Sequence, residues 1–175
     1  MFWSGQRIYK EVLKVVEANR DRLQGIKINP CGVDIGVSNV DRIEDNATAT
    51  LDGERRELDM PKISCKPQNG LYSLKRGVYE ARLNVAVRIP INAIGLSFPR
   101  STLNRLGVIK SETAVFDPGY EGIGVQTVYI PIKELRIAEN ERWFQFVVTD
   151  AMEASSAYNG RYQGEGIKKA RKTKD

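Results

Sequence analysis

The chain has 175 residues, enough for one domain with a sizeable core. It has no histidine and only two cysteines, Cys31 and Cys65. This count excludes a zinc site built from Cys and His ligands, so a catalytic metal would be a hard ion held by oxygen, with magnesium favoured. Two cysteines are too few for a disulfide framework, which favours a cytoplasmic protein. No apolar run is long enough to span a membrane.

The net charge of +5 lies mostly at the C-terminal end. Residues 166–175 carry a net charge of +4, which leaves +1 for residues 1–165. Because the basicity belongs to a tail and not to the body, we expect a solvated, mobile end and do not expect nucleic acid as a partner. A contact between this tail and a polyanion is the alternative.

The pattern of apolar residues predicts one helix followed by many short strands. Ser4 can cap the helix, and apolar residues recur at helical spacing from Ile8 to about Leu23. The clearest strand is Tyr79–Ile89, where apolar and polar residues alternate. Further strands are expected at residues 32–38, 93–98, 113–116, 123–130 and 143–148, with a short helical insertion at 101–106. This order predicts a mainly β fold, a sandwich or distorted barrel, and not a βαβ sheet.

We expect one β domain, including the N-terminal helix, over residues 1–158. Residues 159–175 then form a mobile C-terminal arm and basic tail. The arm contains Gly160, Gly164 and Gly166, which mark a flexible segment that could close over a ligand.

Two short strings carry the groups of a nucleotide site. In the string from Phe98 to Val108, Arg100 and Ser101 lie at a predicted strand-to-helix junction, where free backbone N–H groups gather. An anion there would receive amide hydrogen bonds, the guanidinium group and a hydroxyl. In the alternative, Ser101 only caps the short helix and Arg100 only forms an ion pair.

The second string is Asp117-Pro-Gly-Tyr-Glu-Gly122, whose Pro118 and Gly119 predict the centre of a type II turn. An aspartate that starts such a turn often only bonds the backbone. Next to an aromatic ring it can also hold a water or, through water, a metal. Tyr120 supplies a ring that could pack against a sugar.

The two strings resemble the second and third motifs of the dUTPase and dCTP deaminase superfamily. The resemblance implies a dUTPase-like distorted β-barrel or sandwich (a β-clip) with an N-terminal helix and one short internal helix. It implies that Asp117 orients the attacking water and that Tyr120 packs under the deoxyribose, where a 2′-hydroxyl would clash. Arg100, Ser101 and Thr102 would bind the phosphates.

Two weaker matches flank these motifs. Cys31-Gly-Val-Asp-Ile35 resembles the first motif, which implies that Asp34 supports the phosphates and a metal bound through water; a capped strand start is the alternative. Glu141-Arg-Trp-Phe-Gln145 resembles the fourth motif, in which Gln145 would help hold the water or a phosphate.

The arm, Tyr158-Asn-Gly-Arg-Tyr-Gln-Gly-Glu-Gly166, is similar to the tails of dCTP deaminases and archaeal-type dUTPases. This resemblance implies that Arg161, Tyr162 and Gln163 contact the substrate. Glu165 occupies a position that is often glutamine in such tails, so the contact expected there is not carried over.

The resemblance alone leaves the reaction open. Deaminases of this superfamily use a glutamate ten residues after the third-motif aspartate, where this chain has Thr127 after Gln126. A hydroxyl or an amide cannot act as a carboxylate base. We therefore expect a dUTP pyrophosphatase that uses Mg²⁺ and releases dUMP and diphosphate by water attack on the α-phosphorus. The resemblance also implies a homotrimer with sites between subunits. The alternatives are a dCTP deaminase, mono- or bifunctional, and a nucleotide-responsive binding protein.

Overall fold

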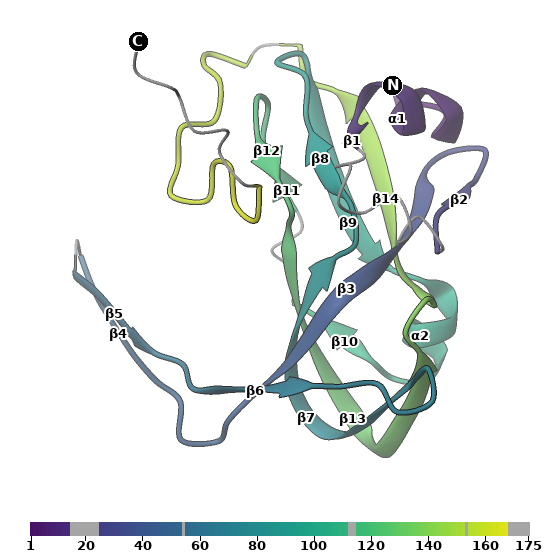
Figure 1. Cartoon of the computed structure of the whole chain (residues 1–175). Coiled ribbons are helices and arrows are strands. Elements are labelled where there is room, and N and C mark those ends of the chain that lie inside the picture. Colours follow the sequence, from purple (N-terminus) through teal and green to yellow (C-terminus); the bar gives the residue numbers. More distant parts are fainter. Residues whose placement is uncertain (15–24, 54, 112–114, 153, 168–175) are drawn as a thin grey trace, which may run out of the picture.

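The computed structural model describes residues 1–14, 25–53, 55–111, 115–152 and 154–167, which form a mainly β fold (Figure 1). The elements in chain order are α1 (Gly5–Glu11), β1 (Leu13–Lys14), β2 (Lys27–Ile28), β3 (Val33–Ile43), β4 (Thr48–Asp52), β5 (Arg55–Asp59), β6 (Lys62–Cys65), β7 (Leu71–Leu83), β8 (Ala86–Arg88), β9 (Ala93–Pro99), α2 (Ser101–Arg105), β10 (Ile109–Lys110), β11 (Val115–Phe116), β12 (Glu121–Gly122), β13 (Val125–Ala138) and β14 (Arg142–Asp150). The predicted mainly β class and the short internal helix are confirmed.

The strands form three sheets among the described residues. The largest has the order β10-β13-β7-β3-β14-β9-β11, and β2 and β6 also pair with β3. It curls around the core (Figure 1). A second sheet has the order β1-β8-β12, and β4 pairs only with β5. In the long pairing of β7 with β13, Thr127 lies opposite Glu80, a register that becomes important for the site.

Strand β14 contributes three large aromatic side chains to the core. Trp143, Phe144 and Phe146 on this strand are fully buried, and Phe146 packs edge-on against Phe116 of β11. Strand β14 lies between β3 and β9, and from Phe144 to Val148 its buried side chains alternate with half-buried ones. This arrangement fixes the positions of Asp34 on β3, Gln145 on β14 and Arg100 just after β9.

Several predicted elements are wrong in their extent. The strand predicted at 32–38 continues to Ile43 as β3, and the strand predicted at 123–130 runs from Val125 to Ala138 as β13. The N-terminal helix ends at Glu11, and Leu13 pairs with Val87 as part of β1. The remainder of that prediction, residues 15–23, lies outside the described part. The predicted strand Tyr79–Ile89 is divided, because β7 ends at Leu83 and β8 begins at Ala86 in a different sheet. All residues from Leu83 to Val87 are buried, so alternation fails where the chain passes between sheets.

No helix in the described ranges is both long and apolar enough to cross a membrane. The described part of the C-terminal arm, up to Ile167, lies beside β12 (Figure 1). Its mobility stays a prediction, and residues 168–175 of the basic tail lie outside the described part.

Candidate nucleotide site

The turn at Asp117–Tyr120 has the geometry that its sequence predicts. Gly119 has a φ of +82°, and the Tyr120 N–H donates to the Asp117 carbonyl at 3.0 Å, as in a type II turn. Two backbone hydrogen bonds join the turn to Ile89. The Gly119 N–H donates to the Ile89 carbonyl, and the Ile89 N–H donates to the Tyr120 carbonyl. The Asp117 side chain is exposed, and in the described part of the chain its carboxylate has no hydrogen bond or ion pair. It is therefore available to a water or a ligand.

Tyr120 is a rigid, neutral wall beside this carboxylate. The residue is 6% exposed, and its ring packs edge-on against Phe116 and Tyr158, at centroid distances of 5.4 and 5.6 Å. Burial raises the pKa of its phenol to about 12, and the nearby Glu165 and Tyr158 add to the shift. The phenol thus stays protonated at neutral pH, and its ring cannot move without disturbing its neighbours.

Asp117 and Tyr120 line a cleft of 840 Å³ that extends along β7 and β13. Of the other predicted residues, Arg161 and Tyr162 line it as well. The sequence arguments missed three charged residues of the lining, Lys62, Glu80 and Arg82, and assigned no contact to a fourth, Glu165. The alternation along Tyr79–Leu83 places Glu80 and Arg82 on one face of β7, which is the signal that could have identified them.

Glu80 lies directly opposite Thr127 across the β7–β13 pair, so a carboxylate faces the cleft beside the position where the deaminase glutamate is absent. The Lys62 Nζ lies 2.8 Å from the Glu80 Oε2. This ion pair occupies one of the two carboxylate oxygens of Glu80.

The arm is bound to the turn through Gln163. The Gln163 side-chain amide donates to the Gly119 carbonyl at 2.9 Å and accepts from the Glu121 N–H at 2.9 Å. Backbone bonds extend this contact, from Gly164 N–H to the Glu121 carbonyl and from Ile123 N–H to the Glu165 carbonyl, both at 2.7 Å. Gln163 thus fastens the arm over Tyr120, while Arg161 and Tyr162 line the cleft.

Asp34, Arg100 and Gln145 form a second group on β3, β14 and the end of β9. Gln145 lies opposite Asp34 in the sheet register. The Arg100 Nε lies 2.9 Å from the Asp34 Oδ2, and its Nη1 lies 3.1 Å from the Glu141 Oε1. Asn29 donates to the other Asp34 oxygen at 2.7 Å. Asp34, at 6% exposed, therefore orients the Arg100 guanidinium group.

Ser101 and Thr102 form the exposed start of α2. The N-cap residue is Arg100, and no side chain caps the helix, so Ser101 does not have the capping role of the alternative interpretation. The ion pairs of Arg100 do agree with that interpretation, but they do not exclude a phosphate contact, because part of the guanidinium side chain is accessible.

The two groups do not meet within one chain. The cleft that holds Asp117 is lined by none of the following predicted residues: Asp34, Arg100, Ser101, Thr102 and Gln145. In Figure 1, α2 and the arm lie on opposite sides of the molecule. A single copy therefore divides the predicted site residues between two surfaces.

The described residues contain no group of three or more His, Cys, Asp or Glu side chains that could hold a metal ion. Both carboxylate oxygens of Asp34 already have protein partners, Asn29 and Arg100. These side chains do not fit a metal bound directly by protein ligands.

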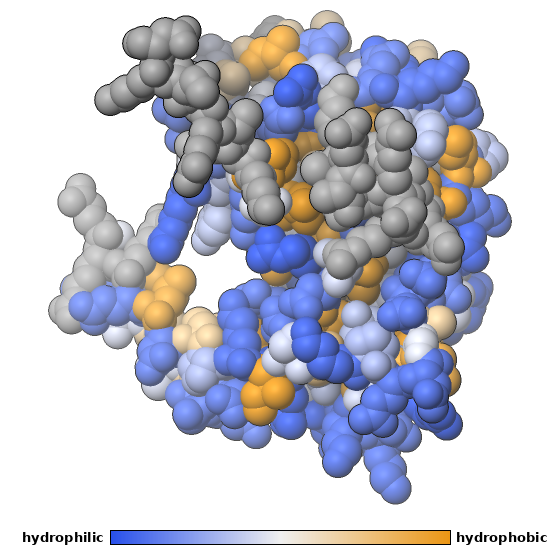
Figure 2. Space-filling view, viewed as in Figure 1, coloured by the Kyte–Doolittle hydropathy of each residue, from blue (hydrophilic) through white to orange (hydrophobic). Residues whose placement is uncertain are grey.

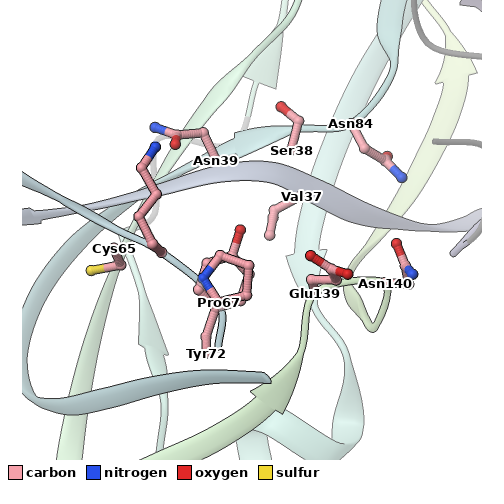
Figure 3. A pocket seen from close by; sticks show the side chains of 10 residues that line it. Val37, Ser38, Asn39, Cys65, Pro67, Tyr72, Asn84, Glu139 and Asn140 are labelled. Atoms are coloured by element: carbon pink, nitrogen blue, oxygen red, sulfur yellow. The ribbon is translucent and has the colours of Figure 1, made fainter. Parts of the chain in front are cut away.

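A second hollow, of 440 Å³, shares no lining residue with the cleft that holds Asp117 (Figure 3). Polar residues from β3, the β6–β7 connection and the β13–β14 turn line it, among them Ser38, Asn39 and Glu139. None of the predicted site residues contributes to it.

Comparison with known proteins gives a consistent picture. A family model described as dCTP deaminase-like matches residues 2–151. A protein of Aeropyrum pernix named probable deoxyuridine 5'-triphosphate nucleotidohydrolase is 36% identical over 172 residues, covering 95% of this chain and 100% of that protein. The deoxyuridine 5'-triphosphate nucleotidohydrolase of Methanocaldococcus jannaschii is 32% identical over 147 residues, covering 82% of this chain and 92% of its own.

Among solved structures, the 2'-deoxycytidine 5'-triphosphate deaminase from Agrobacterium tumefaciens superposes with a TM-score of 0.60 at 16% sequence identity. The match covers 84% of this chain and 46% of the deaminase chain, so this chain spans less than half of that protein. At this identity the likeness shows the fold alone, and it confirms the predicted dUTPase-like β architecture.

Proposed function

The chain belongs to the dCTP deaminase-like family, and on this premise we propose that it hydrolyses dUTP to dUMP and diphosphate. Both relatives described above carry the name of a dUTP nucleotidohydrolase. The observation that carries the proposal is the exposed Asp117 carboxylate at a cleft whose wall is the rigid Tyr120 ring. Such a pair provides a place for a water beside a place for a sugar.

In the proposed reaction, a water held by Asp117 attacks the α-phosphorus in line, and diphosphate leaves. Asp117 supplies orientation and accepts a hydrogen bond from the water. Arg100 and Ser101 stabilise the charge that spreads over the phosphate oxygens, and Asp34 and Glu141 keep the guanidinium group in place. Tyr120 excludes a 2′-hydroxyl by contact, and Arg161 and Tyr162 close the substrate in from the arm.

The division of these residues between two surfaces supports a site shared between copies of the chain. We place Asp117 and Tyr120 on one copy and the Arg100 group on another, within a homotrimer. A closed ring of three copies repeats the same contact three times and yields three equivalent sites. No rearrangement of the fold is then needed.

Magnesium belongs to this proposal as the counter-ion of the triphosphate. Since the described side chains do not fit a directly bound metal, the ion would be held by phosphate oxygens and water, and no step here depends on a protein ligand to it. We place the activity in the cytoplasm, in keeping with two cysteines that are both free.

One observation favours dCTP deamination as a second candidate. Glu80 lies opposite Thr127 and lines the cleft, so it could replace the absent carboxylate from the neighbouring strand. Its ion pair with Lys62 argues against this, because the ammonium group already occupies Oε2, one of the two oxygens through which Glu80 could transfer a proton.

The test is to incubate the protein with dUTP, dCTP or UTP, with and without magnesium, and to separate the products. We expect dUMP and diphosphate from dUTP with magnesium, little hydrolysis of UTP, and neither dUTP nor ammonia from dCTP. Ammonia release from dCTP at a rate comparable to dUTP hydrolysis would falsify the proposal. Loss of that ammonia in Glu80→Gln would then assign the deaminase, whereas tight nucleotide binding with no product would indicate a binding protein.

A further inference from the structure

Strands β4 and β5 form a hairpin that projects from the body (Figure 1). Ala49 pairs with Leu58 and Leu51 with Arg56, so these four positions share one face, and its residues with described side chains are Ala49, Leu51 and Leu58. The described residues of the opposite face are polar: Thr48, Thr50, Asp52, Glu57 and Asp59. The hairpin is therefore amphipathic, as a strand pair is when one face packs on a surface.

Nothing in the described part of the chain covers the apolar face. Every side chain described in β4 and β5 is exposed, with Leu51 at 72% and Leu58 at 51%. The two strands pair only with each other. An isolated two-stranded hairpin is at best marginally stable in water. Burying its exposed leucines would lower the free energy of the protein. A cover for this face would supply both the packing and the burial.

The position of the hairpin indicates which surface could pack against its apolar face. Ala49, Leu58 and Met60 line the cleft that holds Asp117, so the apolar face borders the mouth of the candidate site. Figure 2 shows apolar residues of the hairpin beside the open space between it and the body. The cleft lacks the Arg100 group, which lies on another surface of the same chain. A copy that brings its own Arg100 to Asp117 would lie next to this space.

We propose that the β4–β5 hairpin is a clasp that packs Ala49, Leu51 and Leu58 against a second copy of this chain and holds that copy's Arg100 group over the cleft. This rests on the proposed function insofar as the shared site selects the second copy as the occupant. The clasp links assembly to catalysis: the same contact that buries the leucines completes the phosphate-binding half of the site.

The clasp is tested with the double variant Leu51→Asp/Leu58→Asp in the full chain. A matched control is Ile91→Asp, since Ile91 is also 51% exposed but lies outside the hairpin. Oligomeric state is measured by light scattering and sedimentation over a range of concentrations, with circular dichroism to verify folding. We expect the double variant to dissociate at concentrations on the order of a hundredfold higher than wild type, because a charge in a buried apolar contact is strongly unfavourable. The control should assemble as wild type does.

Hydrogen exchange of wild-type protein gives a second readout that needs no substitution. Hairpin amides should be protected in the assembled protein and exchange on the order of a hundredfold faster after dilution to the monomer. An assembled double variant with unchanged affinity between copies, or a hairpin that exchanges equally fast in both states, would overturn the clasp. So would a double variant that assembles normally and only binds nucleotide more weakly, since the hairpin would then contact the substrate. If wild type assembles through the hairpin but does not hydrolyse dUTP, the proposed function fails and the clasp stands.

Discussion

Asp117 is the residue on which the proposed chemistry depends most. Its carboxylate is exposed at the cleft and has no described protein partner, so its replacement should disturb little else. We predict that Asp117→Asn lowers kcat by on the order of 10²-fold or more, the scale of lost positioning and general-base help. Nucleotide affinity should change little, because the other contacts remain. Steady-state kinetics with a parallel binding measurement checks this, and near wild-type turnover would remove Asp117 from the mechanism.

The Arg100–Asp34 ion pair should matter for stability as well as for phosphate binding. Asp34 is 6% exposed, so removing Arg100 leaves a buried carboxylate bonded only to Asn29 among the described contacts. We predict that Arg100→Met lowers the free energy of unfolding by about 3 kcal/mol, the scale for breaking a buried pair. Adding Asp34→Asn should recover part of this loss.

Urea unfolding of the two single variants and the double variant forms a mutant cycle that measures the coupling. The control is Glu141→Gln, whose side chain is 42% exposed and whose loss should cost less than about 1 kcal/mol. Additive effects of the two substitutions would show that Asp34 does not hold Arg100.

Glu165 predicts a pH dependence of arm docking. Burial raises the pKa of its carboxyl above the ordinary value near 4.5, Arg82 opposes the shift, and Glu80 adds to it. The docked arm therefore binds the proton more tightly than the free arm. The resulting stabilisation is fully present below the ordinary pKa and is lost as the pH rises through the raised pKa.

Protection of the Ile123 amide, which donates to the Glu165 carbonyl, reports this docking. Relative to intrinsic exchange rates, we expect more protection at about pH 4 than at about pH 7 in wild type. In Glu165→Gln the dependence should disappear, since an amide does not titrate. Equal pH dependence in both proteins would assign the effect to other groups.

For individual residues, short motifs were enough to predict Asp117 and Tyr120 together at a turn, because Pro118 and Gly119 determine the local geometry. They did not predict Lys62, Glu80 and Arg82. Those residues reach the cleft only through strand pairing between distant segments, and the register that places Glu80 opposite Thr127 depends on the whole sheet.

The C-terminal arm is the element whose removal is most informative. Its contacts reach the turn and β12, whereas the core strands end at Asp150. We predict that truncation after Tyr158 leaves a folded, assembled protein with sharply reduced hydrolysis, because Arg161 and Tyr162 are lost from the cleft. Circular dichroism, light scattering and kinetics check the three parts of this statement. Full activity in the truncated protein would show that the arm is only a tail.

Alternation predicted that strands with one buried face exist, but it missed several of their boundaries, notably where the chain changes sheets. The alternation of Tyr79–Leu83 identifies the end of β7 but misses its start at Leu71, and the buried run from Leu83 to Val87 gives no sign that Asn84 separates two strands. Helical spacing at Ile8 and Val12 overestimated α1, since Leu13 gains a strand partner in β8 that no local pattern reveals. The β4–β5 hairpin was missed because its short strands lack the apolar content of core strands.

At the scale of the whole molecule, the important feature is the separation of the Asp117 and Arg100 groups. Sequence order brings the two motifs within ten residues of each other, yet the fold places α2 and the Asp117 turn on different sides. No periodicity could predict this, because it results from the path of β10 and β11 to opposite ends of the large sheet. A site shared between copies reconciles nearby motifs with distant groups.

Mixing two inactive variants tests the shared dUTP site most directly. Asp117→Asn and Arg100→Ala proteins are each purified, combined in equal amounts, dissociated and reassembled, and exchange of subunits is verified by mass spectrometry. If Asp117 and Arg100 act from different copies, some sites in mixed assemblies receive both intact residues, and dUTP hydrolysis should return to up to about a quarter of the wild-type rate. Each variant reassembled alone should stay inactive. Mixed assemblies without recovered hydrolysis would contradict a dUTP site formed between copies of this chain.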